Sequence, residues 1–414
     1  MSDRNVRLVV LSRFVSRVGG EAAFFVGLWG KVAFEMGGSL ADIAPVMAAL
    51  GVSTIAGSAI SGVLVDRYDP RRLLIVGEVF FVPATLSILV AETPAQLVGF
   101  SLVLGFFSAP VFTAAAAFAP YLTADNAELE RVNSRLESAA LAAVVFGPAF
   151  GAIAVRYASL DWVFVLDAAT SVVGMLLVLP VRVRDVARVE RSGAFGEIVS
   201  GLRLTYGLGV LRYLVIMSAA LWTVFGIFSA LEPVFFRDVV GTSIESIGWV
   251  NTVFGVGLVA GAMALPRLPR QVSTLRGIGV LVILNGAAVL FYAGTNRLAV
   301  VVAGGLTWGV LIGALIPLGR TLMQWNTPEE VVGRVTGSFQ MHSQAGQLIP
   351  LIFVPWLAAT FGVQTVMVAT GVALGLAGAI GVPIARKLDR AVSPPPRDAV
   401  VGLGAADEPI SPVG

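Results

Sequence analysis

The amino-acid sequence predicts an all-α membrane protein with twelve transmembrane helices in two pseudo-symmetric bundles of six. Three observations lead to this prediction. The 414 residues are 57% hydrophobic and only 13% charged, whereas soluble domains carry about a quarter charged residues. Apolar runs of membrane-spanning length recur along the chain, and the two halves of the sequence resemble each other.

The apolar runs give the expected order of helices. A transmembrane helix needs about 20 mostly apolar residues, each adding about 1.5 Å of length. The first half of the chain has six such runs: Leu8–Ala33, Ile43–Val65, Leu73–Ala91, Ala95–Tyr121, Leu136–Tyr157 and Trp162–Pro180. The second half has six more: Leu211–Phe235, Ile244–Leu265, Gly277–Gly294, Leu298–Leu322, Thr336–Thr360 and Thr365–Ala385. Pro350 predicts a kink inside the eleventh run.

The connections between the runs are short, except for residues 181–210. This segment carries a group of arginines, and we expect it to be a basic linker between an N-terminal bundle (residues 1–180) and a C-terminal bundle (residues 211–386). Residues 387–414 contain Pro394-Pro395-Pro396 and scattered glycines. Such a composition favours a disordered tail.

The distribution of basic residues predicts the orientation in the membrane. Connections on the same side as the N-terminus carry many arginines, among them Arg67, Arg71, Arg72, Arg131, Arg135, Arg267, Arg270 and Arg334. The opposite side has only four basic residues: Lys31, Arg156, Arg237 and Arg297. Because short cytoplasmic loops are enriched in Lys and Arg, we expect both termini in the cytoplasm.

The composition also argues against several classes of function. There is no cysteine and only one histidine, so thiolate and histidine-built metal sites are not expected. No Gly-Lys-Ser/Thr loop is present, which argues against an ATP-driven pump on this chain. The net charge of +2 is too small to suggest nucleic-acid binding. We therefore expect no cofactor, no metal, no nucleic-acid partner and no enzymatic activity.

An internal repeat relates the two halves. Arg131-Val132-Asn133-Ser134 precedes the fifth run, and Arg334-Val335-Thr336-Gly337 precedes the eleventh. The offset of roughly 203–204 residues also places Gly57 on Gly261. Parallel repeats of six helices are the plan of one large group of secondary transporters.

A charged hairpin, residues 62–74, joins the second and third runs. It resembles the signature loop of the major facilitator superfamily, with a glycine, an Asp-Arg pair and a short basic run: Gly62, Asp66, Arg67, Arg71 and Arg72. Asp69 and Pro70 depart from the commonest form. An aspartate at this place, together with the Glu128-Leu129…Asn133 run, resembles the branch that contains siderophore and macrolide exporters.

The resemblance implies that the hairpin is a cytoplasmic latch between the two halves. Carboxylate and guanidinium groups there can form and break charge-assisted hydrogen bonds as the halves rock. We expect Gly62 to admit a neighbouring helix and Glu78, in the third run, to join the network. The alternative is that the arginines only set the orientation in the membrane.

A second partial motif lies in the fifth run, at Gly147, Pro148 and Gly151. It is similar to the kink motif of antiporter and drug-export branches of the same superfamily, although Ala152 replaces the final glycine. Proline removes a backbone donor, and glycines permit a bend and close packing. The resemblance favours export; an ordinary packing helix is the alternative. The arginine that drug/proton antiporters carry in the fourth helix is replaced by Ser101.

Ionisable residues at membrane depth are candidate functional residues, because burying them is costly. Arg17 and Glu21 are one helical turn apart in the first run. If that helix enters at Leu8, Glu21 lies about 20 Å into an apolar core of about 30 Å. We expect Glu21 to be a protonation site; a static ion pair is the alternative. Further candidates for the cavity are Asp167 and His342 and the glutamines Gln340, Gln344 and Gln347, which follow helical spacing. For the glutamines, hydrogen bonding between helices is the alternative.

Together these features predict a monomeric secondary transporter of the bacterial cytoplasmic membrane that works by alternating access. Its expected activity is proton-coupled efflux of a small amphipathic compound such as a drug, siderophore or secondary metabolite. Two alternatives remain open. One is a symporter for metabolite uptake, and the other is a membrane sensor or lipid-handling protein with the same fold.

Overall fold

The structure is a computed structural model that describes residues 3–123, 125–184, 194–328 and 331–389. The expected disordered tail lies outside these residues, apart from its first three positions. Every regular element within the described ranges is helical. This agrees with the predicted class, because a chain in lipid has to satisfy its backbone hydrogen bonds within each segment.

The N half holds six long helices. They are α1 (Asp3–Ala22), α2 (Leu40–Arg67), α3 (Pro70–Ser87), α4 (Pro94–Ala116), α5 (Asn126–Tyr157) and α6 (Asp161–Val178). The first helix continues beyond α1 as two π-helical segments, η1 (Ala23–Leu28) and η2 (Gly30–Glu35). This half also contains two short 3₁₀ turns, Ile88–Val90 and Ala119–Tyr121.

The C half holds the remaining long helices. They are α8 (Gly209–Val234), α9 (Ile244–Ala264), α10 (Leu275–Ala293), α11 (Leu298–Trp325), α12 (Val332–Leu348), α13 (Val354–Phe361) and α14 (Val363–Asp389). The π-helical η5 (Phe235–Val240) extends α8. The predicted linker contains a helix that the sequence did not predict, α7 (Ala194–Gly207). It lies against α12, where Gly201 meets the backbone of Arg334.

Ten of these helices are long and apolar enough to cross a membrane. The segments Val332–Ile352 and Val354–Phe361 are together long and apolar enough for an eleventh span, with a bend of 48° between them. The bend agrees with the kink expected near Pro350. The helix that begins at Asp3 takes the first place in the predicted order of twelve. It is not among the ten, and it carries Arg13, Arg17 and Glu21 within its length.

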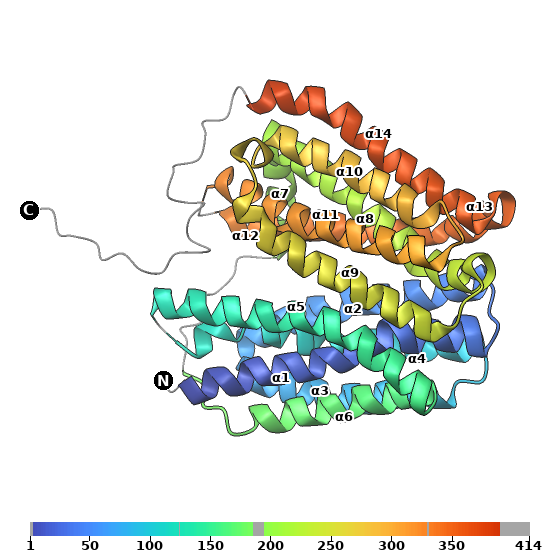
Figure 1. The fold of residues 1–414 in the computed structure, drawn as a ribbon. Helices are drawn as coiled ribbons and strands as arrows, with labels where there is room; N and C mark the ends of the chain where they lie inside the picture. Colours follow the sequence, from blue (N-terminus) through green and yellow to red (C-terminus); the bar gives the residue numbers. More distant parts are fainter. Residues whose placement is uncertain (1–2, 124, 185–193, 329–330, 390–414) are drawn as a thin grey trace, which may run out of the picture.

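The helices are arranged as two groups (Figure 1). Helices α1–α6 form one group and α8–α14 form the other, with α5 of the N half beside α9 of the C half. The start of α1 and the end of α14 lie at the same end of the molecule. We call this the inner end, following the predicted orientation, and the opposite end the outer end.

The repeat seen in the sequence recurs in the packing. A Cβ added at Gly57 of α2 would run into the Phe106 carbonyl of α4, and one at Gly261 of α9 into the Val310 carbonyl of α11. The two glycines are 204 residues apart in the sequence, and so are the two residues whose carbonyls they approach. The same helix pairs also make contacts in the opposite sense. A Cβ added at Gly105 of α4 would run into the Leu50 carbonyl of α2, and one at Gly309 of α11 into the Phe254 carbonyl of α9. The two halves therefore share one packing scheme.

At the outer end the two halves are joined by polar contacts. Arg156 at the end of α5 forms an ion pair with Glu245 at the start of α9, with 3.0 Å between Nη1 and Oε1. Arg237 in η5 donates from Nη1 to the carbonyl oxygens of Ala33 at 2.6 Å and Gly38 at 2.9 Å. These bonds hold the start of the second half against the end of the first helix.

Candidate functional site

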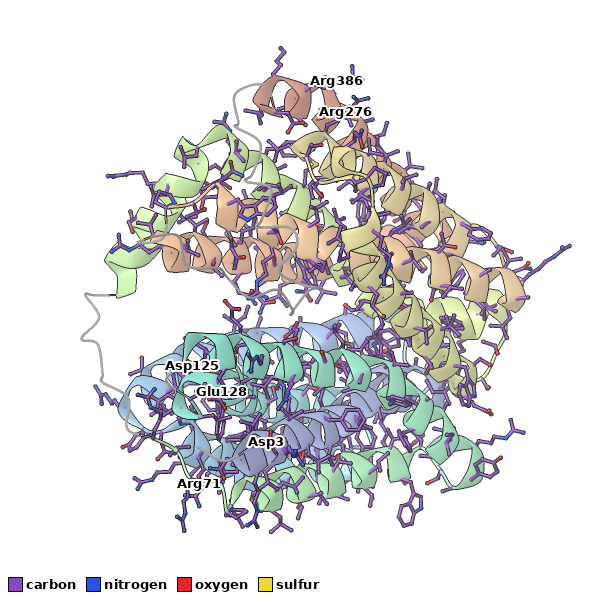
Figure 2. The ribbon with its side chains drawn as sticks, turned by 60° about the vertical axis from the view of Figure 1, so that its left-hand side comes forward. Asp3, Arg71, Asp125, Glu128, Arg276 and Arg386 are labelled. Carbon is purple, nitrogen blue, oxygen red and sulfur yellow. The ribbon has the colours of Figure 1, made fainter. Side chains whose placement is uncertain are left out.

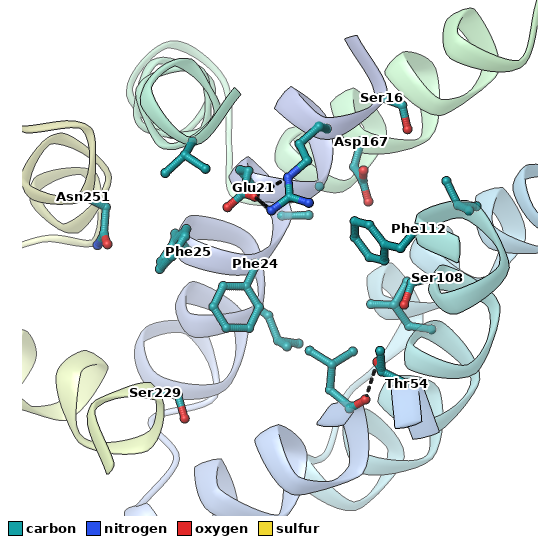
Figure 3. A pocket seen from close by; sticks show the side chains of 18 of the residues that line it. Ser16, Glu21, Phe24, Phe25, Thr54, Ser108, Phe112, Asp167, Ser229 and Asn251 are labelled. Carbon is teal, nitrogen blue, oxygen red and sulfur yellow. Dashed lines mark hydrogen bonds and ion pairs between the residues drawn. The ribbon is translucent and has the colours of Figure 1, made fainter. Parts of the chain in front are cut away.

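A cavity of about 500 Å³ lies between the two halves. Its wall includes residues from α1 to α6 on one side and from α8 to α12 on the other. Figure 3 shows side chains of both halves around it, with Glu21, Phe112 and Asp167 from the N half and Ser229 and Asn251 from the C half. The wall is mostly apolar with a few charged groups, as is usual for small-molecule sites.

Arg17 and Glu21 form an ion pair on the wall contributed by α1. Arg17 donates from Nε to Glu21 Oε1 at 2.8 Å, and Nη2 lies 2.8 Å from the same oxygen (Figure 3). The guanidinium also lies over the ring of Phe112, 5.3 Å from its centre, an arrangement that favours a cation. Both side chains are partly exposed, so water in the cavity reaches them.

Two further carboxylates, Glu78 of α3 and Asp167 of α6, line the same half of the cavity. Each residue is only 1% exposed. Ser16 donates to Glu78 Oε1 at 2.9 Å, and Thr85 donates to Asp167 Oδ2 at 2.7 Å. The structure corrects the expected grouping of Glu78 with the hairpin arginines, because its carboxylate faces α1 and the cavity.

The C half contributes aromatic rings to the wall. Trp308 of α11 is surrounded by four of them, with ring centres 5.1–5.7 Å apart: Phe225, Phe228, Phe254 and Tyr292. Glu232 of α8 is buried beside this cluster and accepts a hydrogen bond from the Tyr292 hydroxyl. Glu232 was not among the predicted cavity residues. Its only signal in the sequence was a carboxylate inside an apolar run.

The polar residues predicted on the eleventh span have different positions. None of Gln340, His342 and Gln344 is among the residues that line this cavity. His342 Nε2 lies 2.7 Å from the Tyr206 hydroxyl of α7, and Nδ1 lies 2.7 Å from the Ser338 carbonyl. Gln347, the third glutamine of the expected stripe, does line the cavity.

The glycine-proline motif of α5 lies where three helices pack closely. A Cβ at Gly147 would collide with Glu21 on α1, and one at Gly151 would lie 2.9 Å from Val26. On the face of α5 that meets the C half, a Cβ added at Gly248 of α9 would lie 2.7 Å from the Pro148 carbonyl oxygen. The motif therefore permits close contact with α1, and its proline lies at the contact between the two halves.

The hairpin between α2 and α3 has a local structural explanation for its unusual residues. Asp69 caps α3 by accepting the Arg72 backbone N–H at 2.9 Å, and Pro70 takes the first helical position; both residue types are favoured there. Arg71, labelled in Figure 2, donates from Nε to the Val178 carbonyl at the end of α6 at 3.3 Å.

Among the described residues, no hydrogen bond or ion pair joins Arg67 or Arg72 to the second half. Gly62 does not admit a close neighbour, because a Cβ added there meets nothing within 4 Å; the expectation for this residue was wrong. Arg67 is exposed at the end of α2. Arg72 pairs with Asp69 of its own helix cap at 3.1 Å. Asp66 lies in the last turn of α2, and its side chain is outside the described part.

The fold and its paired halves define the class of protein. The chain belongs to the Major Facilitator Superfamily, whose model matches residues 9–350 and, in a second match, residues 214–410. It is therefore a multi-pass membrane transporter.

Two relatives with named activities match most of the chain. The multidrug efflux pump Tap of Mycolicibacterium fortuitum is 24% identical over 376 residues, covering 86% of this chain and 91% of that protein. The enterobactin exporter EntS of Escherichia coli is 23% identical over 363 residues, covering 84% of each chain.

Solved structures agree with the fold. A bacterial homologue of the lysosomal transporter Spinster, in an inward-facing and unoccupied conformation, superposes with a TM-score of 0.75 at 13% identity, covering 96% of this chain and all of that one. A point mutant of the nucleoside transporter NupG gives a TM-score of 0.74 at 14% identity, covering 92% of this chain and all of that one. At such identities the likeness concerns the fold alone.

Proposed function

We propose that this protein exports a small amphipathic compound in exchange for protons, by alternating access. The main observation is the cavity between the halves, which has aromatic rings on both walls and most of its ionisable groups on the wall of the N half. Its outer end is closed by contacts between the halves at Arg237 and Arg156. The names of the relatives, a multidrug efflux pump and an enterobactin exporter, support export as the direction.

The wall chemistry supports an amphipathic substrate. Aromatic side chains contribute large apolar contact areas, and a flat ring of a substrate can stack on them. The cluster around Trp308 offers such surfaces, while the Arg17–Glu21 pair faces the same space from the N half. A compound with an apolar ring system and a polar or charged group therefore finds partners on both walls.

Glu21 is the proposed exchange group between proton and substrate. It is ion-paired with Arg17, so binding a proton to its carboxyl would weaken the pair and free the guanidinium. A substrate that competes for Glu21 or Arg17 would then displace the proton. In this proposal both termini are cytoplasmic, the bundles comprise residues 1–180 and 211–386, the hairpin arginines act at the inner end, and the protein is a monomer of the bacterial cytoplasmic membrane.

The test is transport by purified protein in liposomes with an imposed pH gradient and a panel of drugs and siderophores. Export predicts that protons and one compound move in opposite directions. The Glu21→Gln variant should lose this coupling, whereas Glu92→Gln, a change at an exposed residue in the outer connection, should keep it. Movement of protons and compound together would establish uptake, and movement of neither would establish a non-transport role.

A further inference from the structure

Three buried oxygen atoms between α3 and α6 have no hydrogen bond of normal length and angle. They are Glu78 Oε2, Asp167 Oδ1 and Ser171 Oγ. The second oxygen of each carboxyl is already bonded, to Ser16 and Thr85 respectively. Buried polar atoms are nearly always paired, so three orphans on adjoining helices require an explanation.

The three residues are close to one another. Ser171 is one helical turn from Asp167 on α6 and lies beside the carboxyl of Glu78 on α3. Asp167 is itself within electrostatic range of Glu78. A hydroxyl both donates and accepts, so Ser171 has the chemistry to connect two carboxyl groups.

The surrounding charges do not balance this pair. Among the described residues, neither Glu78 nor Asp167 is joined to a basic side chain by an ion pair, since Arg17 is paired with Glu21. Arg13 lies over the Phe112 ring, at 5.7 Å from its centre. Arg13 is also the basic residue within electrostatic range of Glu78, but no ion pair joins them. The ionisable residues of the neighbouring helices are Asp3, Arg4, Arg7, Arg13, Arg17 and Glu21 on α1 and Glu128, Glu130, Arg131, Arg135, Glu137 and Arg156 on α5, with none in α4. Two unpaired buried carboxylates are costly, and a buried group avoids that cost by taking up a proton.

We propose that Glu78, Ser171 and Asp167 form a proton-binding site distinct from Glu21. One proton from cavity water forms an O–H bond at Glu78 Oε2, which donates to Ser171 Oγ. The Ser171 hydroxyl then donates to Asp167 Oδ1. A single proton thus gives all three orphan atoms a partner, and on release it returns to water with no other bond broken.

The first helix covers this site. A Cβ at Gly19 would lie 2.7 Å from Asp167 Cα and 3.0 Å from its Oδ1, so α1 rests directly on the acid. The same helix carries the Arg17–Glu21 pair and packs on α5 at Gly147. A movement of α1 relative to α6 would therefore change how far cavity water reaches the acid, which links this site to the contact between the halves. This transport consequence rests on the proposed function, whereas proton binding itself does not.

The direct test is infrared difference spectroscopy of the purified protein in lipid nanodiscs, titrated with pH. The wild type should show the C=O band of a protonated carboxyl that disappears as the pH rises. Glu78→Gln and Asp167→Asn should each remove or shift this band. The matched surface variant Glu92→Gln should leave it unchanged, and Glu21→Gln should remove only the separate band of its own carboxyl.

Ser171→Ala separates the site from a lone acid, because without the hydroxyl the band should move and titrate at a different pH. Thr85→Val removes only the donor to Asp167 and gives a second probe if an acid variant does not fold. A band unchanged in both acid variants would overturn the proposal. So would a wild-type band that sodium abolishes at constant pH, because the site would then bind a metal cation. Failure to transport any compound, with the band present, would refute the proposed function alone.

Discussion

The two walls of the cavity differ in chemistry although the two halves share one packing scheme. At the spacing of 204 residues that relates the glycine contacts, Glu21 of the N half corresponds to Phe225, and Trp308 of the C half corresponds to Leu104. All four line the cavity. The repeat therefore preserves the backbone contacts and lets the cavity side chains diverge. Aromatic rings such as Phe24 and Phe112 line the N half as well, but that half holds most of the charged groups, and we call it the charged wall. The wall of the C half is built around the ring cluster of Trp308, and we call it the aromatic wall. The glycines are fixed by close helix packing, whereas the cavity residues are fixed by the chemistry of the cavity.

The largest expected effect concerns the aromatic wall. Trp308→Ala removes a buried ring from the centre of four others and should destabilise the C half by about 3–5 kcal/mol. Thermal unfolding in detergent measures this loss. Trp356→Ala is the matched control, because that ring is 64% exposed and should change stability little. Equal effects of the two substitutions would show that the cluster has no special role in the C half.

The shared packing scheme leads to the next prediction. Gly57→Ala and Gly261→Ala each place a methyl group against a carbonyl of the neighbouring helix. Both should destabilise the protein by about 1–3 kcal/mol, the usual cost of overpacking. Gly319→Ala is the control, since a Cβ there meets nothing within 4 Å. A large cost at only one of the paired glycines would break the equivalence of the halves.

Glu232 is a carboxylate on the aromatic wall, so it tests whether proton exchange is confined to the charged wall. If proton exchange belongs to the charged wall, Glu232→Gln should leave the pH dependence of transport unchanged. Stability should fall by about 1 kcal/mol, because the hydrogen bond from the Tyr292 hydroxyl to a carboxyl oxygen is replaced by one to an amide oxygen. The measurement is the rate of transport by Glu232→Gln at several pH values. Tyr292→Phe, which removes the donor of the same hydrogen bond, is measured alongside it. A shifted pH profile would assign coupling to both walls.

The smallest effect is expected at the inner end of the N half. The hydrogen bond from Arg7, and then that from Arg135, hold the pKa of Asp3 below its usual value. The contact therefore contributes to stability above the unfolded pKa of about 3.9 and loses that contribution as the pH falls through the lowered folded value. Asp3→Asn should remove this small acid-side change from thermal melts. An Asp3→Asn melt that keeps the same acid-side change as the wild type would contradict the assignment.

The helices were predictable from the sequence because lipid forces each apolar run to satisfy its own backbone. The cavity wall was only partly predictable. Helical spacing places Arg17 and Glu21 on one face, but it does not reveal which neighbour that face meets. For the same reason the stripe of Gln340, Gln344 and Gln347 was expected in the cavity, whereas of these three only Gln347 lines it. Glu78 shows the other limit, since depth along α3 cannot show whether a side chain turns to the hairpin or to α1.

The bonds of Arg237 have an evolutionary consequence. Both acceptors in the N half are main-chain carbonyls, at Ala33 and Gly38. Substitution of a side chain does not remove a carbonyl, so mutations at these two positions keep the acceptors while the backbone keeps its course. Selection on the strength of closure at the outer end therefore acts mainly through position 237 itself. The acceptor side of this contact therefore tolerates side-chain substitutions, whereas a substitution of Arg237 changes the contact directly.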